Sequence, residues 1–331
     1  MAATIADLAQ TSKDPLIAGV AEHFLMYSDP MKYMPYETIG DFNIAMSRVA
    51  TLPSVAYRAI NGSYSEGTAK FEQLEETISG ILGHDIDIDR ELDGNKTQLV
   101  PQKTLQTKAT MKSIAYKVND DLINGDRATN PLEPDGLRER LDNLASRQRV
   151  AANSTDSLKI FASQATLMSL LDKVEEAIWN VDEGKVDMII GDETSIRGLY
   201  QAVRRIGANA GTVDVRPFGI GAGEQSVRTW TYGGVTIPLM VAGFTDETEA
   251  TRVITLTEDP GDAGNDATSL YFIRTGSEYF TGIEKRSLDV RDLGELQASP
   301  QNRIRVDWPY GYSGFHERWG SRLYGLRWAA T

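Results

Sequence analysis

The stretch Leu122-Ile123-Asn124-Gly125-Asp126 ends a long segment that begins at Pro101 and has the pattern of a single helix. Pro101 suits a first helical turn, and Asn124-Gly125 suits a left-handed helix stop. At about 1.5 Å per residue the helix is expected to be roughly 35 Å long, which is long for a packing element of a small domain. Its apolar side chains recur at three- and four-residue steps, as in a helix with one buried face: Leu105, Met111, Ile114, Ala115, Val118 and Leu122.

An acidic segment lies immediately before this helix. Residues 61–100 contain nine acidic and three basic residues, which gives a local charge of -6. Ile86 and Ile88 alternate with three aspartates, so a strand here has isoleucines on one face and carboxylates on the other. We therefore expect a projecting hairpin that needs another surface to lie on, because an isolated hairpin is marginally stable. A long helix preceded by a projecting arm is typical of a subunit that assembles with other subunits.

The composition excludes several classes of function. The 331 residues include 47 acidic and 34 basic ones, and the formal net charge of -13 repels phosphate backbones, so we expect no sequence-specific nucleic-acid binding. The sequence contains no cysteine, which excludes disulfides, thiolate metal sites and cysteine nucleophiles. No run approaches the roughly 18 apolar residues of a membrane span, and the first residues do not resemble a signal peptide.

The rest of the chain divides into a proline-containing start, a helical middle and a β-rich end. Prolines at positions 15, 30 and 35 leave little room for long helices, so residues 1–40 are expected to form an arm. Helical patterns cover 137–144, 158–178 and 196–206, and an apolar strand at 186–190 predicts a helix-strand-helix layer. Later β-patterns cover 213–218, 227–232, 235–241, 253–257, 270–274 and 304–308.

Four stretches carry a resemblance to a known family: Leu122 to Asp126 followed by Asp135-Gly136-Leu137; Val186 to Asp192 with Ile196 and Leu199; Gly234 to Val241; and Arg305 to Trp308 through Gly314 and His316, then Leu323 to Leu326. They resemble, in order, the end of a spine helix with its following loop, the first strand and helix of an axial domain, a later strand of that domain, and the returning and closing strands. The family is that of the tailed-bacteriophage major capsid proteins, which have the α+β Hong Kong 97 fold. The resemblance covers the chain from residue 40 onward.

The resemblance implies a division of the chain into an arm, an extended loop that overlies a neighbouring subunit, and two domains. The long helix becomes the spine helix of the peripheral domain. The expected parts are the N-terminal arm 1–40, the first part of the peripheral domain 41–60, the extended loop 61–100, the peripheral domain with the spine helix 101–155, the axial domain 156–299, the returning peripheral strand 300–317 and the closing axial strand 318–331.

The resemblance also implies a function. The chain is expected to self-assemble into hexamers and pentamers of an icosahedral phage head around a double-stranded DNA genome, without enzymatic activity or a cofactor. The expected partners are other copies of itself, a separate scaffolding protein, a portal protein and a decoration protein. The expected location is the capsid of the virion, assembled in the host cytoplasm. An encapsulin-like compartment shell is the alternative, and an α/β enzyme is a weaker one.

Patterns that suggest chemistry have better structural explanations. Gly219, Gly221 and Gly223 precede a strand pattern rather than the helix that binds a pyrophosphate, so they predict a loop, which the resemblance places at the capsomer axis. The three aspartates of the acidic segment lack the glycine turn and distal glutamate of a calcium loop. Ser313 lacks the glycine spacing of a nucleophile elbow. These observations leave the enzyme hypothesis without a catalytic constellation.

Charged side chains are the candidates for contacts between subunits. The last thirty residues have a local charge of +3, whereas the acidic segment 61–100 has a local charge of -6. If these two parts meet between subunits, their opposite charges favour the correct register and a high association rate. We also expect that residues 64–96 can be deleted without unfolding the rest, and that neither Lys70 nor Lys96 forms a covalent cross-link with Asn302. The predicted intersubunit residues are Glu66, Glu72, Glu75, Glu76, Asp85, Asp87, Asp89, Arg138, Arg140, Arg318 and Arg322.

Overall fold

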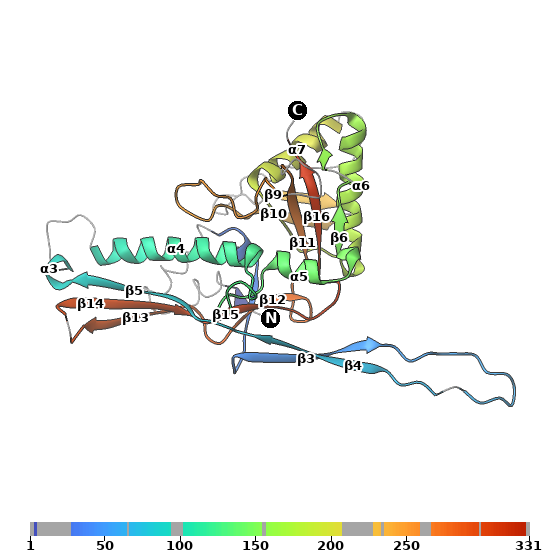
Figure 1. The fold of residues 1–331 in the computed structure, drawn as a ribbon, viewed down its shortest axis with the longest axis horizontal. Coiled ribbons are helices and arrows are strands. Elements are labelled where there is room, and N and C mark those ends of the chain that lie inside the picture. The colour runs from blue at the N-terminus through green and yellow to red at the C-terminus, as the bar shows by residue number, and fades with distance from the viewer. Residues whose placement is uncertain are drawn as a thin grey trace.

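The fold is an elongated α+β structure. Figure 1 shows one long helix that runs from a β-rich wing to a domain of sheet and helices, with a two-stranded ribbon projecting from the body. No helix in the described part of the chain is long and apolar enough to cross a membrane. The computed structural model describes residues 3–4, 28–64, 66–93, 102–153, 157–206, 228–232, 235–258, 266–297 and 299–328.

The long helix predicted from the sequence is confirmed as α4, which spans Gln102–Asn124 and buries its apolar face from Met111 to Leu122. Leu105, predicted on the same face, is 48% exposed. The predicted left-handed stop at Gly125 is wrong, because this residue does not have a positive φ angle. Glycine is needed there for a different reason. A Cβ atom at Gly125 would lie 2.5 Å from the carbonyl oxygen of Asp121 and closer still to that of Pro134.

The β-rich wing is a three-stranded antiparallel sheet in the order β13-β14-β5, and α4 packs along β5. The alternation in the acidic segment is confirmed, because Ile86 and Ile88 of β5 are buried in the core that contains the apolar face of α4. The carboxylates between them lie on the opposite face of the strand. The bounds are Leu82–Asp89 for β5, Asp289–Glu295 for β13 and Gln301–Trp308 for β14, and the short helix α3 covers Arg90–Asp93.

The second domain is a seven-stranded sheet with two helices on one face. Its strands follow the order β6-β16-β11-β8-β10-β9, and β7 pairs with β16. Helix α6 (Gln164–Asn180) begins with a capping box at Ser163, and α7 (Glu193–Ile206) follows β8. The strands are β6 (Arg149–Ala151), β7 (Leu158–Lys159), β8 (Met188–Gly191), β9 (Arg228–Tyr232), β10 (Val235–Val241), β11 (Thr268–Ile273) and β16 (Gly320–Arg327).

The other face of this sheet joins the two domains. Ile189 and Phe272 belong to the core beneath α6 and α7, whereas Ile190 and Tyr271 belong to the core shared with α4 and α5 (Leu137–Asn143). Neighbouring residues of a strand thus point into different cores, as the two-residue period of a strand requires. Two 3-10 helices, η2 (Ser146–Gln148) and η3 (Asp182–Gly184), complete this region.

The projecting ribbon consists of β3, Asn43–Thr51, paired antiparallel with β4, Lys70–Thr77. It therefore begins before the predicted extended loop, and β5 leaves it to pair with β14. The premise that residues 64–96 contribute little to a core is wrong, because Ile86 and Ile88 are buried, and the effect of their deletion on the rest of the chain stays a prediction. Lys70 is exposed on the ribbon, Lys96 lies outside the described residues, and the absence of a cross-link stays a prediction.

The described part of the N-terminal arm joins a four-stranded sheet in the order β1-β2-β12-β15. Met31 and Met34 are fully buried, so this end of the arm is part of the core. Residues 5–27 of the predicted arm lie outside the described residues. The elements are β1 (Ala3–Thr4), η1 (Pro30–Lys32), β2 (Pro35–Thr38), β12 (Phe280–Glu284) and β15 (Tyr310–Gly314).

Two predicted strands have other outcomes. Residues 253–257 do not form a strand, and only isolated bridges at Arg252 and Glu258 flank them. Val253 and Ile254 are fully buried, and this burial explains the apolar pattern that predicted a strand. The predicted strand at 213–218 lies outside the described residues.

Candidate assembly surfaces

The ribbon tip, residues 52–64, exposes a series of large apolar side chains. Val55 and Ile60 are each 94% exposed, and Leu52, Tyr57 and Tyr64 are exposed as well. Monomeric proteins rarely expose contiguous apolar patches unless the patch contacts another molecule. A two-stranded ribbon is also marginally stable by itself. The ribbon tip is therefore the first candidate assembly surface.

One arginine fixes the base of the ribbon to the body. Arg140 of α5 donates to both carboxylate oxygens of Glu76 on β4, at 2.5 and 3.0 Å, and to the carbonyl oxygens of Tyr312 and Asp135, each at 2.8 Å. These bonds connect the ribbon, α5, β15 and the loop after α4. A small apolar cluster lies at the same base, formed by Ile39, Ile78 and Ile283 with Ile44 against it.

We expect Arg140→Gln to lower the free energy of unfolding by about 1–3 kcal/mol, because Glu76 and two carbonyl groups lose charged donors in largely buried surroundings. The matched control is Arg48→Gln, which breaks more exposed pairs with Glu72 on the ribbon (Nη2 to Oε2, 3.0 Å) and with Glu317 (Nη2 to Oε1, 3.4 Å). An exposed pair of this kind contributes about 0.2–1 kcal/mol. Urea unfolding measures both values, and equal losses would show that Arg140 does not clamp the ribbon.

Two bidentate ion pairs connect β5 and β14. Arg305 donates to both oxygens of Asp85 at 2.7 Å, and Arg303 donates to both oxygens of Asp87 at 2.6 Å. These hydrogen bonds hold the pKa of each aspartate below its ordinary value. Their contribution to stability is therefore present above the ordinary carboxyl pKa and is lost as pH falls through the lowered pKa. Asp85 and Asp87, predicted to face a neighbouring subunit, are thus paired within the chain.

A second cluster of half-buried and buried charges joins α5 to the large sheet. Arg138 donates to Glu258 at 2.6 Å, and Arg322 of β16 donates to both oxygens of Asp142 at 3.0 and 2.9 Å. Arg322 also lies 3.3 Å from Glu258. Besides these two arginines, Glu258 accepts a hydrogen bond from the hydroxyl of Ser269. Arg138 and Arg322 were predicted as intersubunit residues, but in this structure their charges are matched within one chain.

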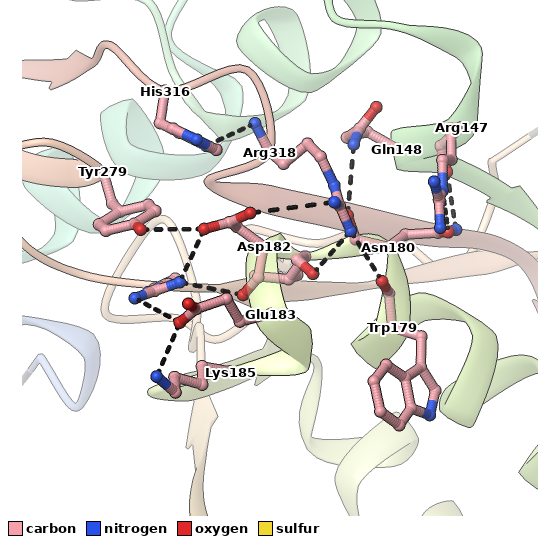
Figure 2. Close-up of polar contacts among 12 residues, drawn as sticks. Arg147, Gln148, Trp179, Asn180, Asp182, Glu183, Lys185, Tyr279, His316 and Arg318 are labelled. Atoms are coloured by element: carbon pink, nitrogen blue, oxygen red, sulfur yellow. Dashed lines mark hydrogen bonds and ion pairs between the residues drawn. The ribbon is translucent and has the colours of Figure 1, made fainter.

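Arg318 caps the end of α6. Figure 2 shows its guanidinium directed at the carbonyl groups that follow one another at the end of this helix. It donates to the carbonyl oxygens of Trp179, Asn180 and Val181 at 3.0, 3.1 and 3.1 Å. A cation at a helix C-terminus satisfies orphan carbonyl groups and interacts favourably with the helix dipole. Arg318, also predicted as an intersubunit residue, has this role within the chain.

The polar network around Arg318 extends to the neighbouring elements. Asp182, just past the end of α6, accepts hydrogen bonds from the hydroxyl of Tyr279 and from Arg274, both at 3.0 Å (Figure 2). His316 accepts the backbone N–H of Arg318 through Nδ1 at 3.1 Å. The network fixes the turn between β15 and β16 against α6, which is a structural role.

Of the remaining residues predicted to act between subunits, some bond to neighbouring residues of the same chain and others are exposed. Asp89 accepts the backbone N–H of Glu91 at 2.9 Å, and Glu72 pairs with Arg48 on the ribbon. Glu66 and Glu75 are exposed on the ribbon, and their contact with another subunit stays a prediction. The predicted capsomer-axis loop lies outside the described residues, with all three of its glycines: Gly219, Gly221 and Gly223.

Sequence reasoning missed the apolar ribbon tip. The isoleucine, valine and tyrosine residues between Phe42 and Ile60 suggest a strand that enters the acidic segment, and this pattern does not mark the tip as an exposed surface. The signal that identifies it is a run of large apolar residues between turn residues, with no acidic residue from 43 to 64. In the described ranges no group of three or more His, Cys, Asp or Glu side chains could hold a metal ion.

No protein-family model matches this chain, and no curated protein matches its sequence. Solved structures match it over nearly the full length of both chains. One match is a chain of the holo-SrpI encapsulin complex from Synechococcus elongatus PCC 7942. The aligned region covers 96% of this chain and 92% of the encapsulin chain, with a TM-score of 0.56 and 14% identity. A chain of Microbacterium phage Oxtober96 gives 89% and 90% coverage, a TM-score of 0.60 and 11% identity.

A chain of the capsid of a native GTA particle gives 91% and 90% coverage, a TM-score of 0.56 and 14% identity. The chain has the Hong Kong 97 fold. The sequence-based prediction of this α+β fold is therefore confirmed. Because the matches extend over most of both chains, the likeness includes the whole architecture rather than one shared domain.

Proposed function

We propose that this chain is the major capsid protein of a tailed bacteriophage and self-assembles into hexamers and pentamers of an icosahedral head around double-stranded DNA. The observation that carries the proposal is the ribbon tip, whose apolar side chains have no cover in the single chain. Burying a large apolar side chain is worth about 1.5–3 kcal/mol, so association is strongly favoured. The fold shared with chains of phage particles supports the same conclusion.

The proposal includes the location and partners of the chain. Its place is the capsid of the virion, after assembly in the host cytoplasm with a separate scaffolding protein, a portal protein and a decoration protein. It is a structural protein and not an enzyme. The charged side chains predicted from the sequence to act between subunits are mostly engaged in pairs that hold the fold together, which supports a structural role.

An encapsulin-like compartment shell is the second candidate. The match with the encapsulin chain, at 96% coverage and a TM-score of 0.56, is the observation that favours it. The two functions differ in what the shell encloses. A cargo enzyme inside shells purified from the native source indicates a compartment, whereas double-stranded DNA with a portal at one vertex indicates a phage head.

We expect the purified chain to form rings or closed shells, alone or with a scaffolding protein. Light scattering measures the assembled mass and electron microscopy shows the particles. Shells boiled in detergent should run as a single band near 36.5 kDa, since no cross-link is expected. A stable monomer at high concentration, with scaffolding protein present, contradicts the proposed function.

A further inference from the structure

The chain contains two Asn-Gly pairs, Asn61-Gly62 and Asn124-Gly125. Such a pair is prone to deamidation, because glycine has no side chain to hinder the attack of its own backbone nitrogen on the preceding asparagine. The first pair lies in the ribbon tip, and the second lies at the end of α4. The same chemistry thus occurs in two different surroundings, and these surroundings decide which pair reacts.

Asn61 lies in an exposed turn of the ribbon tip. The Gly62 N–H donates to the carbonyl oxygen of Ala59 at 2.9 Å, which closes a β-turn, and Asn61 has a φ angle of 66°. Asparagine is one of the few residues besides glycine that tolerate this left-handed conformation. Both residues of the pair are exposed, and the side-chain amide of Asn61 makes no hydrogen bond to another described residue. One solvent-exposed backbone hydrogen bond therefore restrains the pair, and such bonds open readily.

The second pair is held on both sides. The side-chain nitrogen of Asn124 donates to Asp120 Oδ1 at 2.8 Å and to the carbonyl oxygen of Val253 at 2.7 Å. The Gly125 N–H, whose nitrogen would have to attack, donates to the carbonyl oxygen of Asp121 at 3.1 Å. A Cβ at Gly125 would lie 2.5 Å from that oxygen, so the backbone there has little room to rearrange. Deamidation of Asn124 therefore requires local unfolding of the helix end.

We infer that Asn61 is a site of spontaneous deamidation in the folded chain. A hydroxide ion removes the Gly62 N–H proton, and the nitrogen attacks Cγ of Asn61. The side-chain nitrogen takes a proton from water and leaves as ammonia, so a succinimide ring forms. A water molecule then opens the ring at either carbonyl, which leaves aspartate or isoaspartate at position 61. Arg58 donates to the carbonyl oxygen of Gly62 at 3.2 Å, and a cation beside this glycine favours the anionic nitrogen.

The reaction acts on chains that have not assembled, a consequence that rests on the proposed function. Either product adds a carboxylate to residues 43–64, which contain no acidic residue, and isoaspartate also lengthens the backbone. Figure 1 shows that the ribbon extends away from the body, so no other part of the same chain shields the tip. Burying the new charge in an apolar contact costs free energy. Deamidation thus lowers the assembly competence of chains that remain unassembled for long.

Peptide mapping by mass spectrometry measures the reaction at both pairs in one sample. The unassembled chain is incubated at low concentration and mildly alkaline pH, once folded and once in urea. We expect Asn61 in the folded chain to react within about threefold of its rate in urea, and Asn124 to react at least about tenfold slower than in urea. Protection of Asn61 equal to that of Asn124, or greater, overturns the inference.

Gly62→Ala tests the attack itself. Gly62 does not have a positive φ angle, so alanine fits the turn, and the added Cβ would lie 3.2 Å from the carbonyl oxygen of Ala59. The side chain hinders the attacking nitrogen, so we expect deamidation at position 61 to slow by about tenfold while the unfolding temperature stays the same. An unchanged rate shows that Gly62 is not the nucleophile and overturns the inference.

Asn61→Asp tests the consequence for assembly, because it introduces the new charge directly. Asn43→Asp makes the same change at the exposed base of the ribbon and keeps the oxygen that accepts from the Thr77 hydroxyl. We expect Asn61→Asp to raise the concentration needed for assembly about tenfold more than Asn43→Asp does. Equal assembly of the two variants overturns the effect on assembly. Failure of the wild type to assemble contradicts the proposed function, whereas the deamidation rates of the unassembled chain decide the site in either case.

Discussion

Replacing Val55, Tyr57 and Ile60 together by aspartate is expected to abolish shell assembly while leaving the unfolding temperature of the single chain unchanged. These side chains are almost fully exposed, so they contribute nothing to the core of the monomer. In a shell each would be buried, and burial of a large apolar side chain contributes about 1.5–3 kcal/mol. Their loss, repeated at every subunit, exceeds what the remaining contacts can offset. Light scattering measures assembly, and thermal unfolding measures stability.

The control for this variant is Met168→Asp, which adds an aspartate to an exposed apolar position on α6. If any new negative charge prevents assembly, the control fails to assemble too. If the ribbon tip is an assembly surface, the control keeps most of its shell yield. Shells of normal yield from the triple variant would remove the ribbon tip from the interface, and a large loss of unfolding temperature would show that the tip packs against the monomer.

The parts of the fold that the sequence predicted correctly depend on local periodicity. Helix α4 was predicted to within one residue of its observed start at Gln102, because its buried residues recur with the period of a helix. The alternation of Ile86 and Ile88 with aspartates predicted the two faces of β5 for the same reason. A pattern within a few neighbouring residues needs no knowledge of which distant segment packs against it.

The ribbon could not be located this way, because both of its faces are largely solvent-exposed. The burial of β3, Asn43–Thr51, alternates only between exposed and half-buried residues, so no buried face marks its inner side. Strand pairing with Lys70–Thr77 depends on long-range register, which exposed strands specify poorly from sequence. The predicted extended loop therefore began too late and included β5.

The same limit applies to the charged residues. The charged residues predicted to act between subunits have partners far away in the sequence, such as Asp85, whose partner Arg305 is 220 positions away. One signal was available: acidic residues at 85 and 87 and basic residues at 303 and 305 share a two-residue spacing, which suits adjacent antiparallel strands. Spacing alone does not say whether such a pair forms within one chain or between two.

Gly125→Ala is expected to cost about 3 kcal/mol or more, at the upper end of the effect of inserting a methyl group into a packed site. The new Cβ would meet the carbonyl oxygens of Asp121 and Pro134, which are backbone atoms and cannot rotate away as a side chain does. Hydrogen bonds fix both sides of the contact, from the Gly125 N–H to Asp121 O at 3.1 Å and from the Gly136 N–H to Gly125 O at 2.8 Å. Urea unfolding measures the loss.

Two further variants decide the reason for this glycine. Gly40→Ala is the matched control, because nothing lies within 4 Å of the Cβ that it adds, and it should change stability by less than about 1 kcal/mol. Asparagine tolerates the left-handed conformation, so Gly125→Asn should be nearly neutral if the residue were a left-handed helix stop. Close backbone approach predicts that Gly125→Asn is at least as damaging as Gly125→Ala.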